Sequence, residues 1–395
     1  MPKAEHATVA APTRRRRAPA VVAAAVVAAV AVVVAAAVVV TAAAATPGNA
    51  AAHTAQQRRP PAAVGAVAGG YWTPSGANSV DRQYARLARI GVRHTREGFD
   101  WNNIQPAPGQ WDWSFADAMM TAAARHEVRV APIFGYSALW ASAWPRGARP
   151  QMHPPSDYDA YTRYVVETFR RYGAGGRFWD EHPELDPKPI TSAEIWNEPY
   201  GWWFWGQPSP TRYADLVERT ARALDAAGFG RVRIVMHAAL RTYPKHGDLP
   251  RPWIPAIYAA RPALRHLVDV VAVHPYPCSN LDSPLSSNRS PGCPTTRDAI
   301  EGVRQALLAA GAPTPMWVTE IGWAVCPGVC PNLDGRVGVS EATQARHVKD
   351  MIRLARSYPY IRRLYVYSVK PGEPYGLVRA DNSPRPAWHE LAAAN

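Results

Sequence analysis

The feature that most restricts the fold of this chain is an alternation of short apolar runs with longer amphipathic stretches, which continues from about residue 66 to the C-terminus. The apolar runs are continuous rather than alternating with polar residues, which indicates strands buried on both faces of a parallel sheet. The stretches between them are typical of helices, and glycines stand where several of them end. The predicted strands are residues 65–71, 92–96, 128–134, 193–196, 232–236, 268–273, 316–319 and 364–369.

Eight strand–helix units in about 330 residues predict an α/β protein, a (β/α)8 or TIM barrel that forms a single domain over residues 66–395. A doubly wound open sheet is the alternative. It is disfavoured because no predicted strand is followed by a glycine-rich phosphate loop of the G-x-G-x-x-G type.

The N-terminal part of the chain has a different composition. Residues 20–40 are ten alanines and eleven valines, which as a helix would span about 31 Å, close to the hydrocarbon thickness of a bilayer. Four arginines at positions 14–17 directly precede this run, and such positive charge keeps a flanking segment in the cytoplasm. The sequence therefore predicts a basic cytoplasmic N-terminus over residues 1–19, a transmembrane signal anchor or signal peptide over residues 20–45, and an Ala/Pro-rich linker over residues 46–65.

Two alternatives remain open for residues 20–45. An uncleaved segment would anchor the protein in the cell membrane with an extracellular domain. Cleavage among the small residues that follow position 40 would release a secreted protein. In both cases we expect the domain to be exported.

The formal net charge of +13 is concentrated near the N-terminus. Residues 1–65 hold seven of the 44 basic side chains and one of the 31 acidic ones, which leaves 37 and 30 for residues 66–395. This mild excess forms no basic stripe with interleaved aromatic residues. We therefore expect no nucleic-acid partner.

Four cysteines lie in the second half of the chain. An even number of cysteines in an exported domain predicts disulfides rather than a metal site. Zinc is disfavoured because the Cys-x3-Cys spacing lacks a second ligand pair at finger-like distance. Cys278–Cys293 with Cys326–Cys330 is the local pairing, one of three possible connectivities.

Polar residues gather at the ends of the predicted strands, where barrel enzymes carry their chemistry. Two glutamates, Glu198 after the fourth strand and Glu320 after the seventh, would face each other across the barrel mouth. Two such carboxyl groups suit glycoside hydrolysis, in which one protonates the leaving oxygen and the other meets the developing positive charge. Their proximity would also separate their pKa values, so that one stays protonated while the other is ionised.

The segments Ile195-Trp-Asn-Glu-Pro199 and Trp317-Val-Thr-Glu-Ile-Gly-Trp323 resemble the retaining glycoside hydrolases of clan A, in particular the cellulase-like and xylosidase-like families 5 and 39. The resemblance implies a catalytic barrel that cleaves β-glycosidic bonds of a poly- or oligosaccharide by double displacement. It implies Glu198 as the acid/base and Glu320 as the nucleophile that forms a covalent glycosyl-enzyme. It implies a β-linked glycan as the partner, and neither a metal nor an organic cofactor.

The same resemblance assigns further roles. Asn197 would bind the sugar 2-hydroxyl, Tyr276 would hydrogen-bond the nucleophile with His274 on the same wall, and Arg96 would lie near the nucleophile. A salt bridge between helices is the alternative for Arg96. Glu194 lies on the strand of Glu198 but deeper, where a buried structural pair is more plausible than catalysis.

Aromatic residues are expected to contact the sugar. Clan A enzymes usually carry a Trp on strand eight, where this chain has Tyr367, so a tyrosine would have to substitute. Trp202, in the aromatic loop 201–206, and Trp323 are further candidates, because rings stack well on the apolar faces of sugars. The alternative is that these rings pack the loops onto the barrel. Residues 288–290 also fit a glycosylation sequon.

A non-catalytic carbohydrate-binding surface protein on the same barrel is the second hypothesis. It is motivated by the atypical strand-eight segment, whereas nothing in the glutamate pair supports it.

Overall fold

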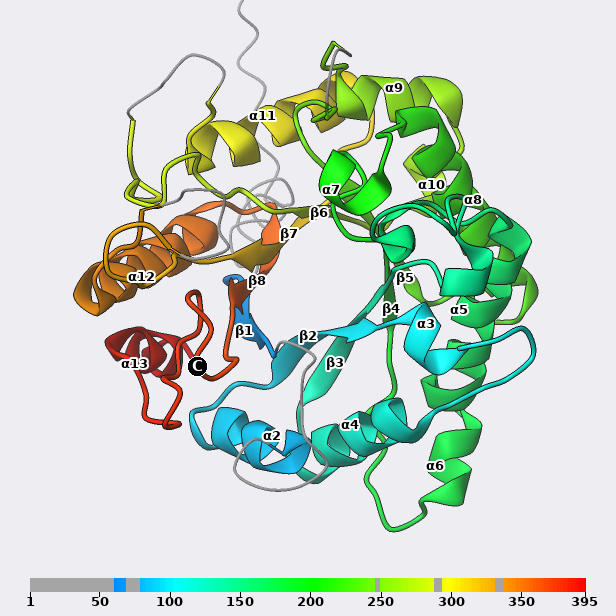
Figure 1. Ribbon diagram of the computed structural model, residues 1–395, viewed down its shortest axis with the longest axis horizontal. Coiled ribbons are helices and arrows are strands. Elements are labelled where there is room, and N and C mark those ends of the chain that lie inside the picture. The colour runs from blue at the N-terminus through cyan, green and yellow to red at the C-terminus, as the bar shows by residue number, and fades with distance from the viewer. Residues whose placement is uncertain (1–59, 69–78, 246–248, 288–292, 331–336) are drawn as a thin grey trace, which may run out of the picture. The chain divides into compact units, whose positions relative to one another are not determined.

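The computed structural model describes residues 60–68, 79–245, 249–287, 293–330 and 337–395. The strands are β1 (Ala63–Val67), β2 (His94–Phe99), β3 (Arg129–Phe134), β4 (Ser192–Ile195), β5 (Arg233–Ala238), β6 (Val270–Val273), β7 (Met316–Ile321) and β8 (Ile361–Tyr367). They pair in parallel in sequence order, and β8 pairs with β1, so that the barrel is closed (Figure 1). The predicted (β/α)8 barrel is therefore confirmed.

Helices surround the barrel on its outer side (Figure 1). They are α2 (Val80–Arg89), α3 (Trp101–Ile104), α4 (Ser114–Arg125), η1 (Leu139–Ala141), η2 (Pro150–Met152), α5 (Tyr158–Tyr172), α6 (Arg177–Glu181), α7 (Trp202–Trp205), α8 (Pro210–Ala226), α9 (Trp253–Ala260), α10 (Leu264–Leu267), α11 (Thr296–Ala309), α12 (Glu341–Ser357) and α13 (Pro386–Ala393). Several begin at side chains that accept a hydrogen bond from the first turn, as Ser79 does for α2 and Ser340 for α12. Gly311, after α11, has a φ of +69°, a left-handed conformation that glycine adopts without steric cost.

The core has two layers, because successive strand residues point to opposite faces. The outer layer lies between strands and helices. The inner layer fills the barrel with Val67, Ala131, Val235, Val270, Ala272, Trp317 and Tyr365. On β4, Ala193 and Ile195 belong to the outer layer, so the alternation directs Glu194 into the barrel.

Some predicted boundaries differ from the structure. β1 begins at Ala63, so the last residues assigned to the linker 46–65 form a strand, and the rest of the linker before residue 60 lies outside the described residues. β2 continues to Phe99 instead of ending near Arg96, because its pairing with β3 extends to Phe134.

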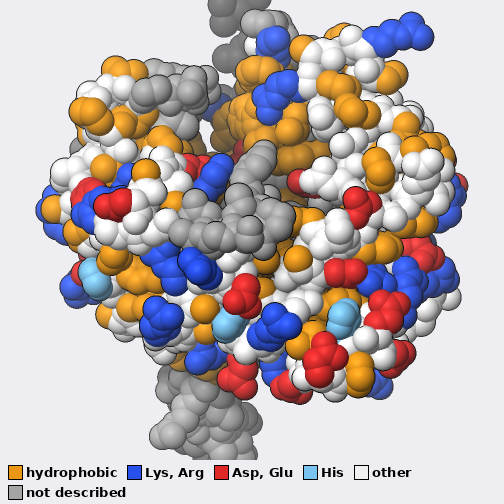
Figure 2. Space-filling view, turned by 60° about the horizontal axis from the view of Figure 1, so that its bottom comes forward, with side chains coloured by type: hydrophobic (Ala, Val, Ile, Leu, Met, Phe, Trp, Pro, Cys, Tyr) orange, Lys and Arg blue, Asp and Glu red, His pale blue; other side chains and the backbone are white. Residues whose placement is uncertain are grey.

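The predicted segments at residues 1–19 and 20–45 and the sequon at 288–290 also lie outside the described residues. Among the helices that the structure describes, none has the length and apolarity needed to cross a bilayer. Acidic and basic side chains intermingle over the face that Figure 2 presents.

Candidate active site

Two glutamates meet at the mouth of the barrel. Glu198 follows β4, where Trp196 and Glu198 have φ values of +64° and +42°, in the left-handed region that is strained for residues other than glycine. Glu320 lies on β7, next to a register shift between Val318 and Ile321. Such irregularities re-aim side chains, and here both Thr319 and Glu320 reach the site.

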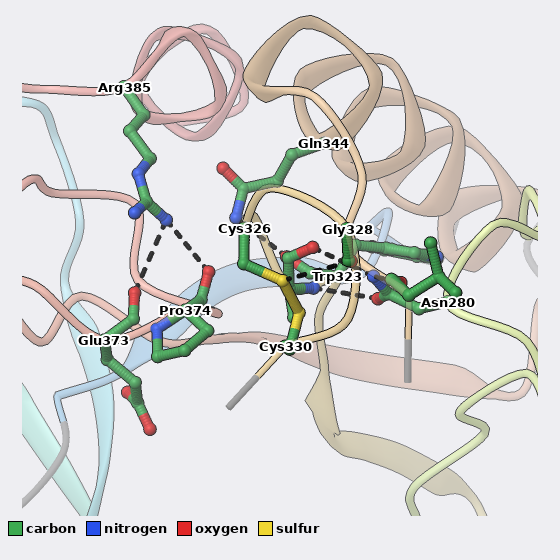
Figure 3. The surroundings of a disulfide bond; sticks show 11 residues. Asn280, Trp323, Cys326, Gly328, Cys330, Gln344, Glu373, Pro374 and Arg385 are labelled. Carbon is green, nitrogen blue, oxygen red and sulfur yellow. Dashed lines mark hydrogen bonds between the residues drawn. A yellow bond between two sulfur atoms is a disulfide. The ribbon is translucent and has the colours of Figure 1, made fainter. Parts of the chain in front are cut away.

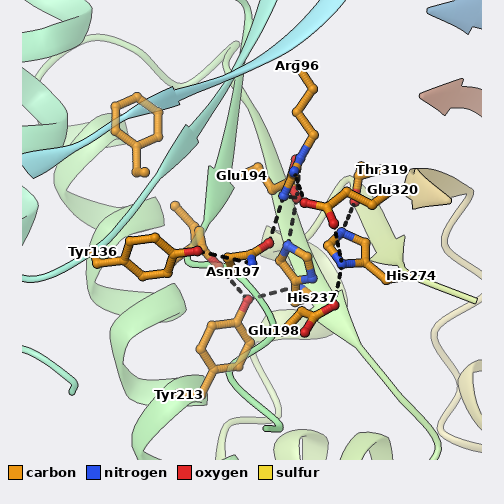
Figure 4. Close-up of polar contacts among 12 residues, drawn as sticks. Arg96, Tyr136, Glu194, Asn197, Glu198, Tyr213, His237, His274, Thr319 and Glu320 are labelled. Atoms are coloured by element: carbon orange, nitrogen blue, oxygen red, sulfur yellow. Dashed lines mark hydrogen bonds and ion pairs between the residues drawn. The ribbon is translucent and has the colours of Figure 1, made fainter. Parts of the chain in front are cut away.

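The two carboxylates are close together. An oxygen of Glu198, a ring nitrogen of His274 and an oxygen of Glu320 lie within 4.8 Å of one another. Both glutamate side chains are mostly buried, with exposed fractions of 13% and 14%. The structure therefore brings together the pair that the sequence singled out (Figure 4).

Arg96 hydrogen-bonds both to residues at the mouth of the barrel and to a carboxylate deeper inside it. Its Nη1 donates to Glu320 Oε1 at 2.6 Å, and its Nη2 donates to Asn197 Oδ1 at 2.9 Å. Its Nε and Nη2 also donate to the buried carboxylate of Glu194. This guanidinium lies inside the barrel, so the alternative of a salt bridge between helices is wrong.

Arg96 and the deeper carboxylate of Glu194 shift each other's pKa. Burial by itself would lower the pKa of Arg96, but the carboxylates of Glu194 and Glu320 raise it above its ordinary value. Burial would raise the pKa of Glu194, but the charge of Arg96 and the hydrogen bond with His237 hold that pKa far below its usual range. Glu194 is therefore held in its charged form beside Arg96 and orients the guanidinium.

Each oxygen of Glu198 has a hydrogen-bond partner. Oε1 lies 2.8 Å from His274 Nδ1, and Oε2 accepts a 2.5 Å hydrogen bond from Trp203 Nε1. Burial alone would raise the pKa of Glu198, but these bonds and the charge of His274 outweigh burial and lower it. His274 Nε2 lies 2.9 Å from the hydroxyl of Thr319.

Tyrosines complete the surroundings of the nucleophile candidate. The Tyr276 hydroxyl donates to Glu320 Oε2 at 3.4 Å. The Asn197 side-chain amide donates to the hydroxyl of Tyr136 at 3.2 Å. Tyr367, at the end of β8, donates its hydroxyl to Glu373 at 2.9 Å.

A pocket of about 630 Å³ opens over the carboxylates. Its walls combine aromatic, aliphatic and charged side chains. The aromatic and charged residues that line it are Arg149, Glu198, Tyr200, Trp203, Phe204, Tyr243, His274, Tyr276, Glu320, Tyr367 and Tyr375. A mostly apolar cavity with a few convergent polar groups is typical of a small-molecule or sugar site.

Two predicted sugar contacts lie away from this pocket. Trp323 is only 1% exposed, donates its Nε1–H to the Asp282 carbonyl and packs against His347. Trp202 is 38% exposed and faces Lys245 outside the pocket lining. The buried ring of Trp323 leaves no face for a sugar, whereas the sugar contact expected of the half-exposed Trp202 stays a prediction. Trp203, which the sequence analysis did not single out, lines the pocket together with Phe204 and is the ring of this loop that contacts Glu198.

The cysteines pair as Cys278–Cys293 and Cys326–Cys330, which confirms the local connectivity. Cys278 lines the pocket. The second disulfide lies in the loop after β7, beside Trp323 (Figure 3).

Two clusters among the described residues have the reach to hold a metal ion, namely Glu194, His237 and His274, and Glu198, His274 and Glu320. Arg96 contacts a carboxylate of each cluster, so its positive charge opposes a second cation there. The side chains are instead joined by hydrogen bonds, which suits acid–base chemistry.

Comparison with known proteins supports the barrel fold. Neither the family models nor the curated proteins give a match. Solved structures do give matches. A family 39 glycoside hydrolase from Bacteroides cellulosilyticus WH2 superposes with a TM-score of 0.55 at 17% identity, covering 85% of this chain and 63% of that one. This chain thus spans less than two thirds of that enzyme.

Two further structures give similar values. A family 39 β-xylosidase from Caulobacter crescentus has a TM-score of 0.53 at 16% identity, over 85% of this chain and 72% of that one. A glucosidase from Croceicoccus marinus has a TM-score of 0.57 at 13% identity, over 84% of this chain and 67% of that one. The barrel is similar to those of glycoside hydrolases. At these identities the likeness concerns the fold.

Proposed function

We propose that this protein is a retaining glycoside hydrolase that acts on β-linked glycans. The observation that carries the proposal is the approach of Glu198 and Glu320 oxygens to within 4.8 Å. Retaining enzymes hold their carboxyl groups about 5–5.5 Å apart, whereas inverting enzymes need about 6.5–9.5 Å to admit a water molecule. The likeness in fold to glycoside hydrolases supports the same conclusion.

In the first step the Glu320 carboxylate attacks the anomeric carbon while Glu198 transfers a proton to the departing glycosidic oxygen. In the second step Glu198 takes a proton from water, the resulting hydroxide oxygen bonds to the anomeric carbon, and the bond to Glu320 breaks. Arg96 and Tyr276 donate hydrogen bonds to Glu320 and orient it. Asn197, fixed by Arg96 and Tyr136, would meet the sugar 2-hydroxyl.

Variants of the two glutamates test this assignment with activated aryl β-xylosides and β-glucosides. Glu320→Gln should abolish turnover. Glu198→Ala should retain part of the first step with good leaving groups and should recover product formation with azide. Glu184→Gln, at a side chain that is 60% exposed, is the matched control and should match the wild type. Near wild-type activity in Glu320→Gln would contradict the assignment.

We further propose that the domain is exported, either anchored through residues 20–45 or secreted after cleavage. The two disulfides support an oxidising compartment. Fractionation followed by N-terminal sequencing of the mature chain distinguishes the two forms, and recovery in the cytosol with all four thiols reduced would overturn export.

A carbohydrate-binding protein without turnover is the second candidate. The observation that favours it is Tyr367, which stands where clan A enzymes usually have a Trp and donates a hydrogen bond to Glu373. Oligosaccharide binding in calorimetry without product from any glycan would support this candidate over the first.

A further inference from the structure

His274 contacts a polar partner at each ring nitrogen. Its Nδ1 lies 2.8 Å from Glu198 Oε1, and its Nε2 lies 2.9 Å from Thr319 Oγ1. Both His274 and Thr319 side chains are fully buried. A neutral imidazole donates at one nitrogen and accepts at the other, so the partner at Nε2 decides what Nδ1 presents to Glu198.

A threonine hydroxyl can accept or donate. If Thr319 donated to Nε2, Nδ1 would carry a fixed hydrogen directed at Glu198 and would oppose protonation of that carboxylate. If Thr319 accepts from Nε2–H, Nδ1 is free to gain and lose a proton across the 2.8 Å contact. A proton shared between Glu198 and His274 requires the second arrangement.

We propose that Thr319 is a positioning residue that fixes the Nε2–H form of His274, so that His274 and Glu198 share the proton used in acid–base catalysis. This inference rests on the proposed glycosidase function. In the first step the Nδ1 proton passes to the Glu198 carboxylate, the carboxyl group so formed gives one proton to the glycosidic oxygen and returns to the carboxylate, and His274 becomes neutral with Nε2–H retained. In the second step Glu198 takes a proton from water and shares it again with Nδ1. One proton leaves and one returns in each cycle.

The charges around His274 fit a shared proton. Glu320 Oε2 lies 3.7 Å from Nδ1, so the carboxylates of both Glu198 and Glu320 lie near this nitrogen. The guanidinium of Arg96 pairs with Glu320 and Glu194. His237 meets the ring edge-on at 4.8 Å between centroids.

Two more groups belong to this environment. Tyr276 lies 6.5 Å from the His274 ring centre and donates to Glu320. The indole N–H of Trp203 donates to the far oxygen of Glu198. Because two groups donate to its carboxylate, Glu198 by itself holds a proton weakly. A proton shared with His274 stays available to Glu198 for catalysis. Groups coupled this closely titrate as a pair.

The experiment compares Thr319→Val, which keeps the branched shape, with Thr319→Ser, which keeps the hydroxyl. Kinetics are measured on aryl glycosides with good and poor leaving groups across the pH range. Thr319→Val should lose about 10- to 100-fold in kcat/KM on poor leaving groups, within the range of acid catalysis, and little on good ones. Its alkaline limb should move to lower pH, because the proton is held less well. Thr319→Ser should restore both kcat/KM on poor leaving groups and the position of the alkaline limb.

Histidine-¹⁵N NMR of the wild type reports the tautomer directly, with His274→Asn used to assign the signal. Protonated Nε2 in the neutral ring supports the inference, and protonated Nδ1 overturns it. Equal losses on good and poor leaving groups with an unmoved pH profile would also overturn it. If the wild type hydrolyses no glycoside in the panel, the proposed function itself fails. If Thr319→Val does not fold, Thr319→Ser kinetics and the NMR tautomer still decide.

Discussion

Trp203 donates its indole N–H to Glu198 across 2.5 Å, from a helix that begins four residues after that glutamate. Trp203 also packs over Gly201, where an added Cβ would lie 2.3 Å from the ring. The glycine therefore leaves the space that this hydrogen bond requires, and Trp203 links the acid/base candidate to the pocket wall.

Trp203→Phe removes the donor but keeps an aromatic ring. Loss of a hydrogen bond to the charged form should raise the pKa of Glu198, so the carboxyl group stays protonated to higher pH. We expect the alkaline limb of the pH profile of kcat/KM to move upward. Gly201→Ala should shift it in the same direction by displacing the ring. An unchanged limb in both variants would show that the bond has no role in tuning Glu198.

Arg96 neutralises two buried carboxylates, so its removal should be costly. Arg96→Ala leaves Glu194 and Glu320 without their cation, and breaking such a buried pair typically costs about 3–5 kcal/mol. Thermal unfolding measures this cost. Arg163→Ala is the control, since its 3.7 Å pair with Asp157 is exposed and should be worth less than about 1 kcal/mol. Similar shifts in Tm for the two variants would refute the role given to Arg96.

Glu97 predicts a specific dependence of stability on pH. It lies on β2 and is buried, with one oxygen hydrogen-bonded to Tyr84 and the other without a partner, and burial raises its pKa to about 8. The folded state therefore binds a proton that the unfolded state releases above about pH 4.5. Its contribution to stability is complete below that pH and is lost as pH rises through about 8.

Glu97→Gln should remove this dependence, because the amide is neutral at every pH. Tm measured from pH 5 to 9 should fall less steeply in the variant than in the wild type. The exposed Glu127→Gln serves as control and should keep the wild-type slope. Parallel curves for Glu97→Gln and the wild type would mean that Glu97 is charged in the folded protein.

The two disulfides should differ in effect. Cys278 lines the pocket and closes a 15-residue separation, for which chain entropy suggests about 3 kcal/mol, whereas Cys326 and Cys330 are four residues apart. Replacing Cys278 and Cys293 by serine should lower Tm more and alter the pattern of products from a glycan panel. Replacing the other pair should leave the product pattern unchanged. The same product pattern in both variants would exclude a role for the first disulfide in shaping the pocket.

Much of this architecture could be predicted from the sequence because the strands are short, apolar and punctuated by helix-ending glycines. The glutamate pair could be placed because strand ends share one face of a barrel. The ends of β1 and β2 could not be predicted, because pairing with neighbouring strands determines where these strands begin and end.

Aromatic roles were the least predictable. The segment Trp202–Trp205 offers four aromatic residues in one short helix, and only packing over Gly201 directs Trp203 rather than Trp202 into the site. Trp323 follows β7 closely, but the chain turns after Ile321 and buries the ring against α12. The partners of Arg96 likewise depend on the inward side of β4, which carries Glu194.

We propose that Glu320 attacks the sugar and that Glu198 serves as its acid/base. Labelling with an activated 2-deoxy-2-fluoro glycoside, followed by peptide mass mapping, measures this most directly. We expect one glycosyl group per chain, attached to Glu320, with turnover lost in proportion to labelling. A label on another residue, or hydrolysis without any covalent intermediate and with inversion at the anomeric carbon, would contradict the account.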